Sequence, residues 1–240
     1  RTHQSQETLL QVVVSEKTNE IPVAQALLPC LPVDGRIITA DALHTQKNFM
    51  QCVDALGAKT VLTVKNNQPM LYADLTTYFA DPHASFEQAS TRDQHRGRIE
   101  TRSLRVSSEL NSYLTDWPLI QQVAELTRTV TSRKTGKTSH EVVYLITPLT
   151  ALQASPLRLL EVVRGHWSIE NSSHYVRDGT FGEDRSQLRS GQAPQILATF
   201  RNLAITLIHR LGSSQIAATR RRFASHPREA FRLLLPRRSA

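Results

Sequence analysis

The chain has few cysteines, no long apolar run and no Met at its start. Its two cysteines, Cys30 and Cys52, fit no metal-binding spacing and are too few for a disulfide framework, which indicates reduced thiols. No run of 18 apolar residues is present, so the sequence predicts no membrane-spanning helix. Residues 1–8 lack the apolar core of a signal peptide, and nothing favours secretion. The missing initiator Met indicates a fragment or a processed product.

Internal repeats and low-complexity segments are also lacking, apart from clusters of arginine. The chain has 240 residues, of which 40% are hydrophobic, so it can bury a sizeable core. This length predicts one large domain, or one domain that carries an insertion.

Acidic residues are scarce in the last part of the chain. Residues 1–200 contain 20 Lys and Arg against 20 Asp and Glu, whereas residues 201–240 contain nine Arg and a single acid. Arg220, Arg221 and Arg222 form the centre of this basic region. Because guanidinium groups make forked contacts with phosphate oxygens, the region predicts salt-dependent binding to nucleic acid without sequence preference. A solubilising tail is the alternative.

The first third of the chain alternates between strand and helix patterns. Residues 8–15 form a β-branched apolar run that predicts a strand, and residues 18–28 predict a helix. A buried strand over residues 35–41, a helix over 45–56 and a second buried strand over 58–64 follow. This alternation predicts an α/β layer with parallel strands.

The pattern changes in the middle of the chain. Residues 84–148 alternate polar and apolar side chains and predict an antiparallel β insertion, with a hairpin turn at residues 134–137. Helical patterns return over residues 156–175, 192–211 and 215–235.

Two carboxylates are candidates for catalysis. Asp41 ends a predicted parallel strand, at the edge where open α/β sheets bind ligands. Glu170 lies between His166 and His174, four residues from each, so the three share one face of the predicted helix. Two carboxylates that converge on Mg²⁺ or Mn²⁺ suit phosphoryl transfer, because hard oxygen ligands favour these ions over zinc. The alternatives are a capping role for Asp41 and an exposed position for Glu170 on an amphipathic helix.

Several motifs occur in the order found in a known family. They closely resemble bacterial insertion-sequence transposases of the H-repeat-associated group, within the DDE superfamily, over the chain up to residue 212. The motifs are T-A-D-A-L-H-T-Q-K (39–47), V-L-T-V-K-N-N-Q-P (61–69), H-R-G-R-I-E-T-R (95–102), R-G-H-W-S-I-E-N (164–171), F-G-E-D-R-S (181–186) and N-L-A-I (202–205).

The resemblance implies a ribonuclease H-like fold that is interrupted by an antiparallel β insertion and has a helical C-terminal end. It divides the chain into a first core half (1–83), the insertion (84–150), core helices with the catalytic Glu (151–212) and a basic helical tail (213–240). It implies DNA strand cleavage and strand transfer at insertion-sequence ends with two Mg²⁺ or Mn²⁺ ions. The implied partners are double-stranded DNA and further copies of the chain, with no membrane, in a cytoplasmic, nucleoid-associated location.

Residue by residue, Asp41 matches the family's second catalytic Asp and Glu170 its catalytic Glu, and both are implied to bind metal. Arg177 matches a basic residue that is expected to contact DNA, with an exposed helix arginine as the alternative. Lys65, close to Asp41 in the predicted sheet, is a candidate for phosphate contact.

The resemblance also has a gap. The family's first catalytic Asp lies on the first strand of the sheet, and no residue before Leu9 fits that strand. We therefore expect the first strand to be missing and this chain alone not to catalyse strand transfer. The competing hypothesis is a non-catalytic DNA-binding module that relies on the Arg-rich end.

Overall fold

The computed structural model describes residues 1–5, 7–12, 20–95, 97–169, 176–188, 190–213 and 215–234. The chain divides into two compact units, and each is described by itself. The larger unit comprises residues 14–164, and the smaller comprises residues 1–13 together with 165–240.

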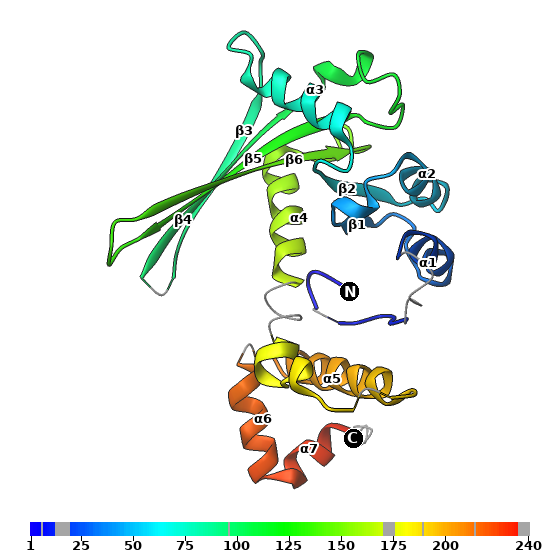
Figure 1. Ribbon diagram of the computed structural model, residues 1–240, viewed down its shortest axis with the longest axis vertical. Coiled ribbons are helices and arrows are strands. Elements are labelled where there is room, and N and C mark those ends of the chain that lie inside the picture. Colours follow the sequence, from blue (N-terminus) through cyan, green and yellow to red (C-terminus); the bar gives the residue numbers. More distant parts are fainter. Residues whose placement is uncertain are drawn as a thin grey trace, which may run out of the picture. The chain divides into compact units, whose positions relative to one another are not determined.

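The larger unit is built on one six-stranded sheet with the strand order β1-β2-β6-β5-β4-β3 (Figure 1). β1 and β2 are parallel, and all other neighbouring strands are antiparallel. The predicted mixture of α and β structure is confirmed, but parallel pairing is limited to one pair of strands. The strands are β1 (Ile37–Ala40), β2 (Lys59–Val64), β3 (Glu87–His95), β4 (Arg98–Ser107), β5 (Gln122–Ser132) and β6 (Thr138–Thr147).

Four helices belong to this sheet's chain segment: α1 (Glu20–Leu27), α2 (Lys47–Ala55), α3 (Pro69–Ala80) and α4 (Pro156–Ile169). The helices predicted for residues 18–28 and 45–56 are confirmed as α1 and α2. The helix predicted for 156–175 is confirmed as far as residue 169, and its remaining residues lie outside the described ranges. Chain reversal after α2 uses Gly57, whose φ of +74° lies in the left-handed region that favours glycine.

The core of the larger unit lies where α2 and α3 pack against β2 and β6. Leu71, Leu75 and Phe79 recur at four-residue spacing, so they share the face of α3 that is buried. Leu62 and Ile146, which are fully buried, are paired across β2 and β6. Burial of side chains of this size stabilises a fold by roughly 1.5–3 kcal/mol each.

Two long hairpins extend from this core. The antiparallel strands predicted within residues 84–148 and the turn at 134–137 are confirmed as β3 to β6. The strands continue the sheet of β1 and β2, because β6 pairs directly with β2. We call residues 90–103 and 127–142 the arm: its four strands run past the last buried residues of the sheet (Figure 1).

The strand predicted for residues 8–15 is wrong for its described part. Residues 8–12 have no regular secondary structure and run along a helix of the smaller unit instead. The Thr8 N–H donates to Thr206 Oγ1 at 3.4 Å, and the Asn202 side chain donates to the side chain of Gln11. Tertiary contacts therefore took the place of the strand pairing that the β-branched composition predicted. The strand predicted at residues 35–41 is present as β1, but it is half-buried rather than buried.

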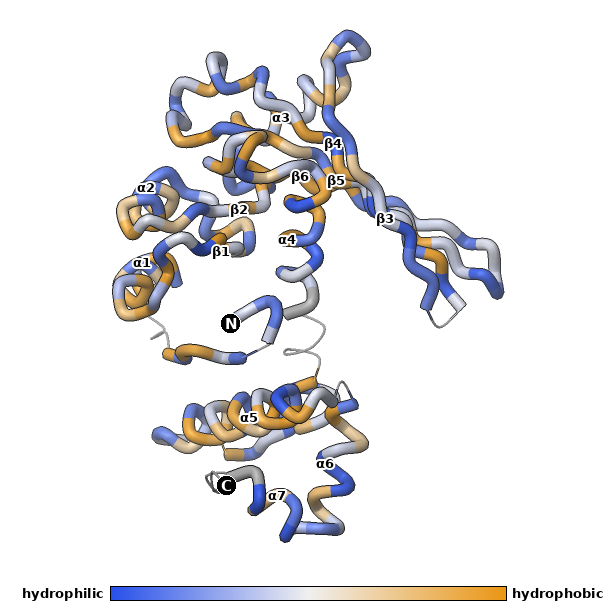
Figure 2. Tube along the Cα trace, turned by 180° about the vertical axis from the view of Figure 1, so that it is seen from behind, coloured by the Kyte–Doolittle hydropathy of each residue, from blue (hydrophilic) through white to orange (hydrophobic). Residues whose placement is uncertain are grey.

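The smaller unit is helical, with α5 (Ala193–Arg210), α6 (Ile216–Ser225) and α7 (Pro227–Leu234). These confirm the helices predicted for 192–211 and 215–235, and Gly212 at φ +76° separates the first two. Ile205, Ile208 and Ile216 form a small apolar cluster between α5 and α6, where both helices carry hydrophobic residues (Figure 2). Among the described residues, no helix is long and apolar enough to cross a membrane.

Candidate active site

Asp41 lies at the carboxyl end of β1, as predicted. Ala40 pairs with Leu62 in the parallel register, so Asp41 follows at the edge where β2 also ends. It precedes a short 3₁₀ turn, Ala42–His44, and its side chain makes no capping hydrogen bond to that turn. The Asp41 side chain is exposed to solvent. The capping alternative is not what the structure shows, and the carboxylate is open to a ligand.

Side chains from the next strand end hold the backbone of the Asp41 loop. Asn67 Nδ2 donates to the Ala42 carbonyl, and Gln68 Nε2 donates to the Thr45 carbonyl at 2.8 Å. Thr45, which is fully buried, donates through Oγ1 to the Thr63 carbonyl at 2.6 Å. Three hydrogen bonds thus join the loop after β1 to β2 and its following loop. They fix the backbone from which the Asp41 carboxylate projects.

Asp41 can supply the type of oxygen ligand that Mg²⁺ or Mn²⁺ prefers. Its carboxylate is available, because it makes no hydrogen bond or ion pair with another described residue. Within the described ranges, no three His, Cys, Asp or Glu side chains gather in a way that would hold a metal ion. Glu170, the second predicted ligand, lies outside those ranges. The described residues therefore supply one suitable ligand, and its convergence with Glu170 stays a prediction.

Lys65 directly follows β2 and is exposed at the same edge of the sheet as Asp41. Its ammonium group forms no ion pair in the described part of the chain. This position agrees with the predicted contact to a phosphate near Asp41, which stays a prediction.

Arg177 is held by a carboxylate of its own unit. Its Nε and Nη2 donate to the two carboxyl oxygens of Glu183, both at 2.5 Å, and the two side chains are only 23% and 20% exposed. Arg201 lies 3.8 Å from the same carboxylate. The hydrogen bonds that Arg177 donates to the Glu183 carboxylate raise the pKa of Arg177. The alternative of an exposed, solvated helix arginine therefore does not hold, and contact with DNA stays a prediction.

The arginine cluster at residues 220–222 is partly engaged within the smaller unit. Arg220 donates to the Thr180 carbonyl and lies over the Phe181 ring, 5.3 Å from its centroid. Arg222 forms a 2.9 Å ion pair with Glu229. Arg221 is exposed and forms no such contact among the described residues. Of the three predicted DNA contacts, Arg221 has the most freedom to bind phosphate.

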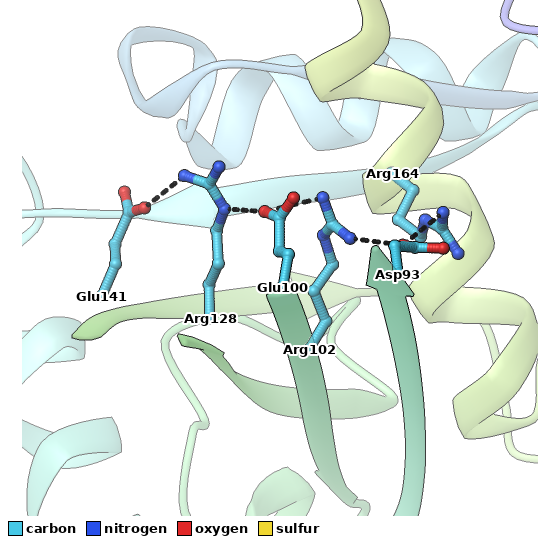
Figure 3. Close-up of polar contacts among 6 residues, drawn as sticks. All are labelled: Asp93, Glu100, Arg102, Arg128, Glu141 and Arg164. Atoms are coloured by element: carbon cyan, nitrogen blue, oxygen red, sulfur yellow. Dashed lines mark hydrogen bonds and ion pairs between the residues drawn. The ribbon is translucent and has the colours of Figure 1, made fainter. Parts of the chain in front are cut away.

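A row of alternating charges crosses the arm (Figure 3). In spatial order it consists of Glu141, Arg128, Glu100, Arg102, Asp93 and Arg164. Arg102 binds Asp93 and Glu100 at 2.8 Å each, and Arg128 binds Glu100 and Glu141.

The row also ties the arm to α4. Asp93 of β3 accepts a hydrogen bond from Arg164 of α4 at 2.9 Å. In the strand register, Asp93 faces Glu100 and Arg102 faces Arg128, which are unfavourable like-charge pairs. The diagonal contacts place opposite charges between them, so every charge in the row has at least one partner of opposite sign.

The family assignment rests on nearly the whole chain. Residues 2–207 match the family described as "Transposase DDE domain". The chain belongs to the DDE transposase family.

Curated relatives agree with this assignment. The "H repeat-associated putative transposase YhhI" of Escherichia coli K12 is 26% identical over 209 residues, which is 82% of this chain and 54% of the relative. The "Putative transposase YncI" of Escherichia coli O157:H7 is 28% identical over 204 residues, with shares of 82% and 52%. The chain thus spans about half the length of the curated relatives it matches. The crystal structure of Streptomyces venezuelae DesVI aligns at 15% identity over 63% of this chain and 62% of its own, but its TM-score of 0.24 is too low to bear on the fold.

Sequence reasoning missed the residues that support the site. Asn67 and Gln68 stand in the motif V-K-N-N-Q-P, where only Lys65 was assigned a role. A run of amide side chains in the loop after a buried strand is the signal, because such side chains can satisfy the carbonyls of a neighbouring loop. The link between Asp93 and Arg164 joins residues 71 positions apart. No local pattern predicts such a pair.

Proposed function

We propose that this DDE transposase chain takes part in metal-dependent DNA strand cleavage and strand transfer at the ends of an insertion sequence. Family membership supports DNA as the substrate. The observation that carries the proposal for this chain is the exposed Asp41 carboxylate at the carboxyl ends of two parallel strands, held on a hydrogen-bonded loop. A ligand position on a fixed backbone is what phosphoryl transfer requires, since catalysis there depends on positioning and charge.

The roles of the residues follow from their positions. Asp41 and Glu170 would hold two Mg²⁺ or Mn²⁺ ions, which when bound polarise the phosphate and favour deprotonation of the attacking hydroxyl or water. Asn67 and Gln68 keep the backbone next to Asp41 in place. Lys65 and Arg221, whose cationic ends form no ion pair in the described ranges, would contact DNA phosphates.

The proposal includes a ribonuclease H-like core. The parallel pair β1 and β2 with the carboxylate at its carboxyl end supports this fold. Residues 1–83 and 151–212 would form the core, residues 84–150 the β insertion and residues 213–240 a basic tail. A homo-oligomer acting on paired DNA ends at the nucleoid completes the proposal.

Paramagnetic Mn²⁺ tests the metal site. In a titration followed by NMR, Mn²⁺ should broaden the amide signals of residue 41 and of residue 170 at the same ion concentration. Asp41→Asn should remove the broadening at both positions, because each ion would lose a ligand. Asp116→Asn is the matched control, since Asp116 is 85% exposed and lies outside the proposed site. Unchanged broadening in Asp41→Asn, or broadening at only one of the two positions, would contradict a shared metal site.

The alternative, a non-catalytic DNA-binding module, makes a different prediction. Its affinity for duplex DNA would depend on Arg221 and its neighbours and would survive Asp41→Asn with no metal binding at all. The exposure of Arg221 favours DNA contact there, but it applies equally to a catalytic transposase.

A further inference from the structure

The end of the arm carries four cations that form no ion pair among the described residues. We call Arg98, Arg133, Lys134 and Lys137 the basic tip. All four are exposed, and none of their side chains forms a hydrogen bond or an ion pair in the described part of the chain. By contrast, Arg102 and Arg128, farther down the arm, are each bound to two carboxylates.

The two hairpin tips form one surface. The Arg133 N–H donates to the Gly97 carbonyl at 2.8 Å, and Arg98 pairs with Ser132 across β4 and β5. The turns use Gly97 at φ +76° and Gly136 at φ +67°, and nothing lies within 4 Å of a Cβ placed at either. Figure 2 shows the end of the β5–β6 hairpin as hydrophilic. The tip is therefore open to a large partner.

Among the described residues, no acid forms an ion pair with the cations of the basic tip. Residues 94–98 contain two Lys or Arg and residues 132–140 contain three, and neither segment contains Asp or Glu. The nearest acids along the strands, Asp93, Glu100 and Glu141, are already bound to arginines in the row of charges. These acids are thus paired within the row and form no ion pair with the cations of the tip in the described ranges.

The tip projects well beyond the hydrophobic core. Leu126 is the last fully buried residue of β5, and Ser132 lies six residues farther along the strand. At about 3.4 Å per residue, the tip stands roughly 20 Å from that point. Strands of this length are not needed to bury apolar residues, so we expect the outer half of the arm to serve another purpose.

We propose that the basic tip is a second DNA-binding surface, which contacts the phosphate backbone of a duplex. A four-stranded sheet with strands about 4.8 Å apart is roughly 14 Å wide before side chains are counted. The major groove is about 12 Å wide and admits only a two-stranded ribbon. The tip therefore binds phosphates across the duplex surface and reads no bases. This inference rests on the proposed function, in which DNA is the substrate.

Salt dependence measures such contacts directly. Each phosphate contact contributes about 0.9 to the slope of log affinity against log salt for duplex DNA. The variant Arg133→Gln/Lys134→Gln/Lys137→Gln should therefore lower the slope by up to about 2.7. Between about 50 and about 200 mM salt, the ratio of wild-type to variant affinity should change by up to roughly 40-fold.

A matched control separates location from net charge. Arg36→Gln/Lys47→Gln/Arg158→Gln removes the same three charges from exposed positions of the larger unit outside the arm. Fluorescence anisotropy with a random-sequence labelled duplex should show a slope change for the tip variant and less than about 0.9, one contact, for the control. Equal slopes for the two variants would overturn the proposal. So would a tip variant that loses affinity for single-stranded RNA but keeps its affinity for duplex DNA.

The outcomes also distinguish this inference from the proposed function. If the wild-type chain binds duplex DNA and the tip variant binds with the same slope, only the tip is excluded. If the tip variant changes the slope but Mn²⁺ does not broaden residues 41 and 170, the tip stands and the catalytic proposal fails. Absence of any duplex binding by the wild-type chain at low salt would overturn both.

Discussion

Removing Arg102 from the row of charges should destabilise the larger unit far more than removing Arg128. Arg102 is 13% exposed and binds two carboxylates, Asp93 and Glu100, at 2.8 Å each. Arg128 is 37% exposed, and its partner Glu141 is 56% exposed. We expect Arg102→Met, which keeps an apolar stem of similar length, to lower the free energy of unfolding well beyond Arg128→Met.

The magnitude follows from burial and strand register. A hydrogen bond to a charged group contributes about 1.5–3 kcal/mol, and partial exposure of Asp93 and Glu100 reduces this, so two bonds give about 2–3 kcal/mol. The register then leaves Asp93 directly opposite Glu100 without a cation between them, which adds up to about 1 kcal/mol. For Arg128, which is 37% exposed and binds Glu100 and Glu141, the surface value of about 0.2–1 kcal/mol per pair applies.

Urea unfolding with a single fluorescent reporter measures the difference. The chain has two tryptophans, and Trp117 is 7% exposed in the core of the larger unit. In a Trp167→Phe background, the fluorescence of Trp117 reports this unit alone. The double variant Arg102→Met/Glu100→Gln should be less destabilised than the sum of its single changes by about 1–2 kcal/mol, because both remove one interaction. Additive losses, or equal losses for Arg102→Met and Arg128→Met, would refute the reasoning.

Three further outcomes are expected. Gly57→Ala should lower the free energy of unfolding, measured by urea titration, by at least about 1–2 kcal/mol. The loss should exceed that of Gly35→Ala. Both glycines have positive φ, but only at Gly57 would a new Cβ meet a carboxylate oxygen, that of Asp34 at 2.1 Å. Arg177→Gln and Glu183→Gln should each destabilise the smaller unit by about 1–3 kcal/mol in thermal unfolding, Glu183→Gln by the larger amount because it also loses its contact with Arg201. Loss of duplex affinity in Arg177→Gln alone would instead assign its guanidinium to DNA contact. Burial raises the pKa of the Tyr78 hydroxyl in the folded chain, so the unfolded chain loses this proton first. Stability should therefore fall as the pH rises above about 10. In urea titrations across that range, Tyr78→Phe should lose less stability than the wild type, and an identical decline would contradict this.

The elements that the sequence predicted well are those with local signals. In α2, apolar residues recur at helical spacing and Gly57 follows, so both the helix and its end are encoded within a few positions. The turn at residues 134–137 combines Gly136 with alternating strands on both sides. Residues 8–12 show the opposite case. Their β-branched pattern is typical of a strand, but their hydrogen bonds go to Asn202 and Thr206 of α5, which no local pattern can reveal.

The candidate site shows the same difference between residues with local sequence signals and residues whose roles depend on tertiary contacts. Asp41 was predicted because a carboxylate at the end of a parallel strand is visible in the sequence. The roles of Asn67 and Gln68 depend on how the loops after β1 and β2 meet, which is set by the register of the two strands. Likewise, Glu100 and Arg102 lie two residues apart on β4. Only the register shows that Arg102 is paired with Arg128, so that the Glu100 carboxylate, which binds both, compensates their like charges.

The distribution of charge shows why composition alone gave an incomplete account of DNA binding. By count, the whole positive charge of the chain resides in residues 201–240, and residues 1–200 are neutral. In the structure, two of the three arginines at residues 220–222 are engaged within their own unit. The neutral segment contains the basic tip, because the acids that balance it bind Arg102, Arg128 and Arg164. A duplex near the tip meets cations roughly 20 Å beyond Leu126, whereas the nearest acids along the strands are paired with arginines of the row. Local separation of charge, more than net charge, therefore decides which surface attracts a polyanion.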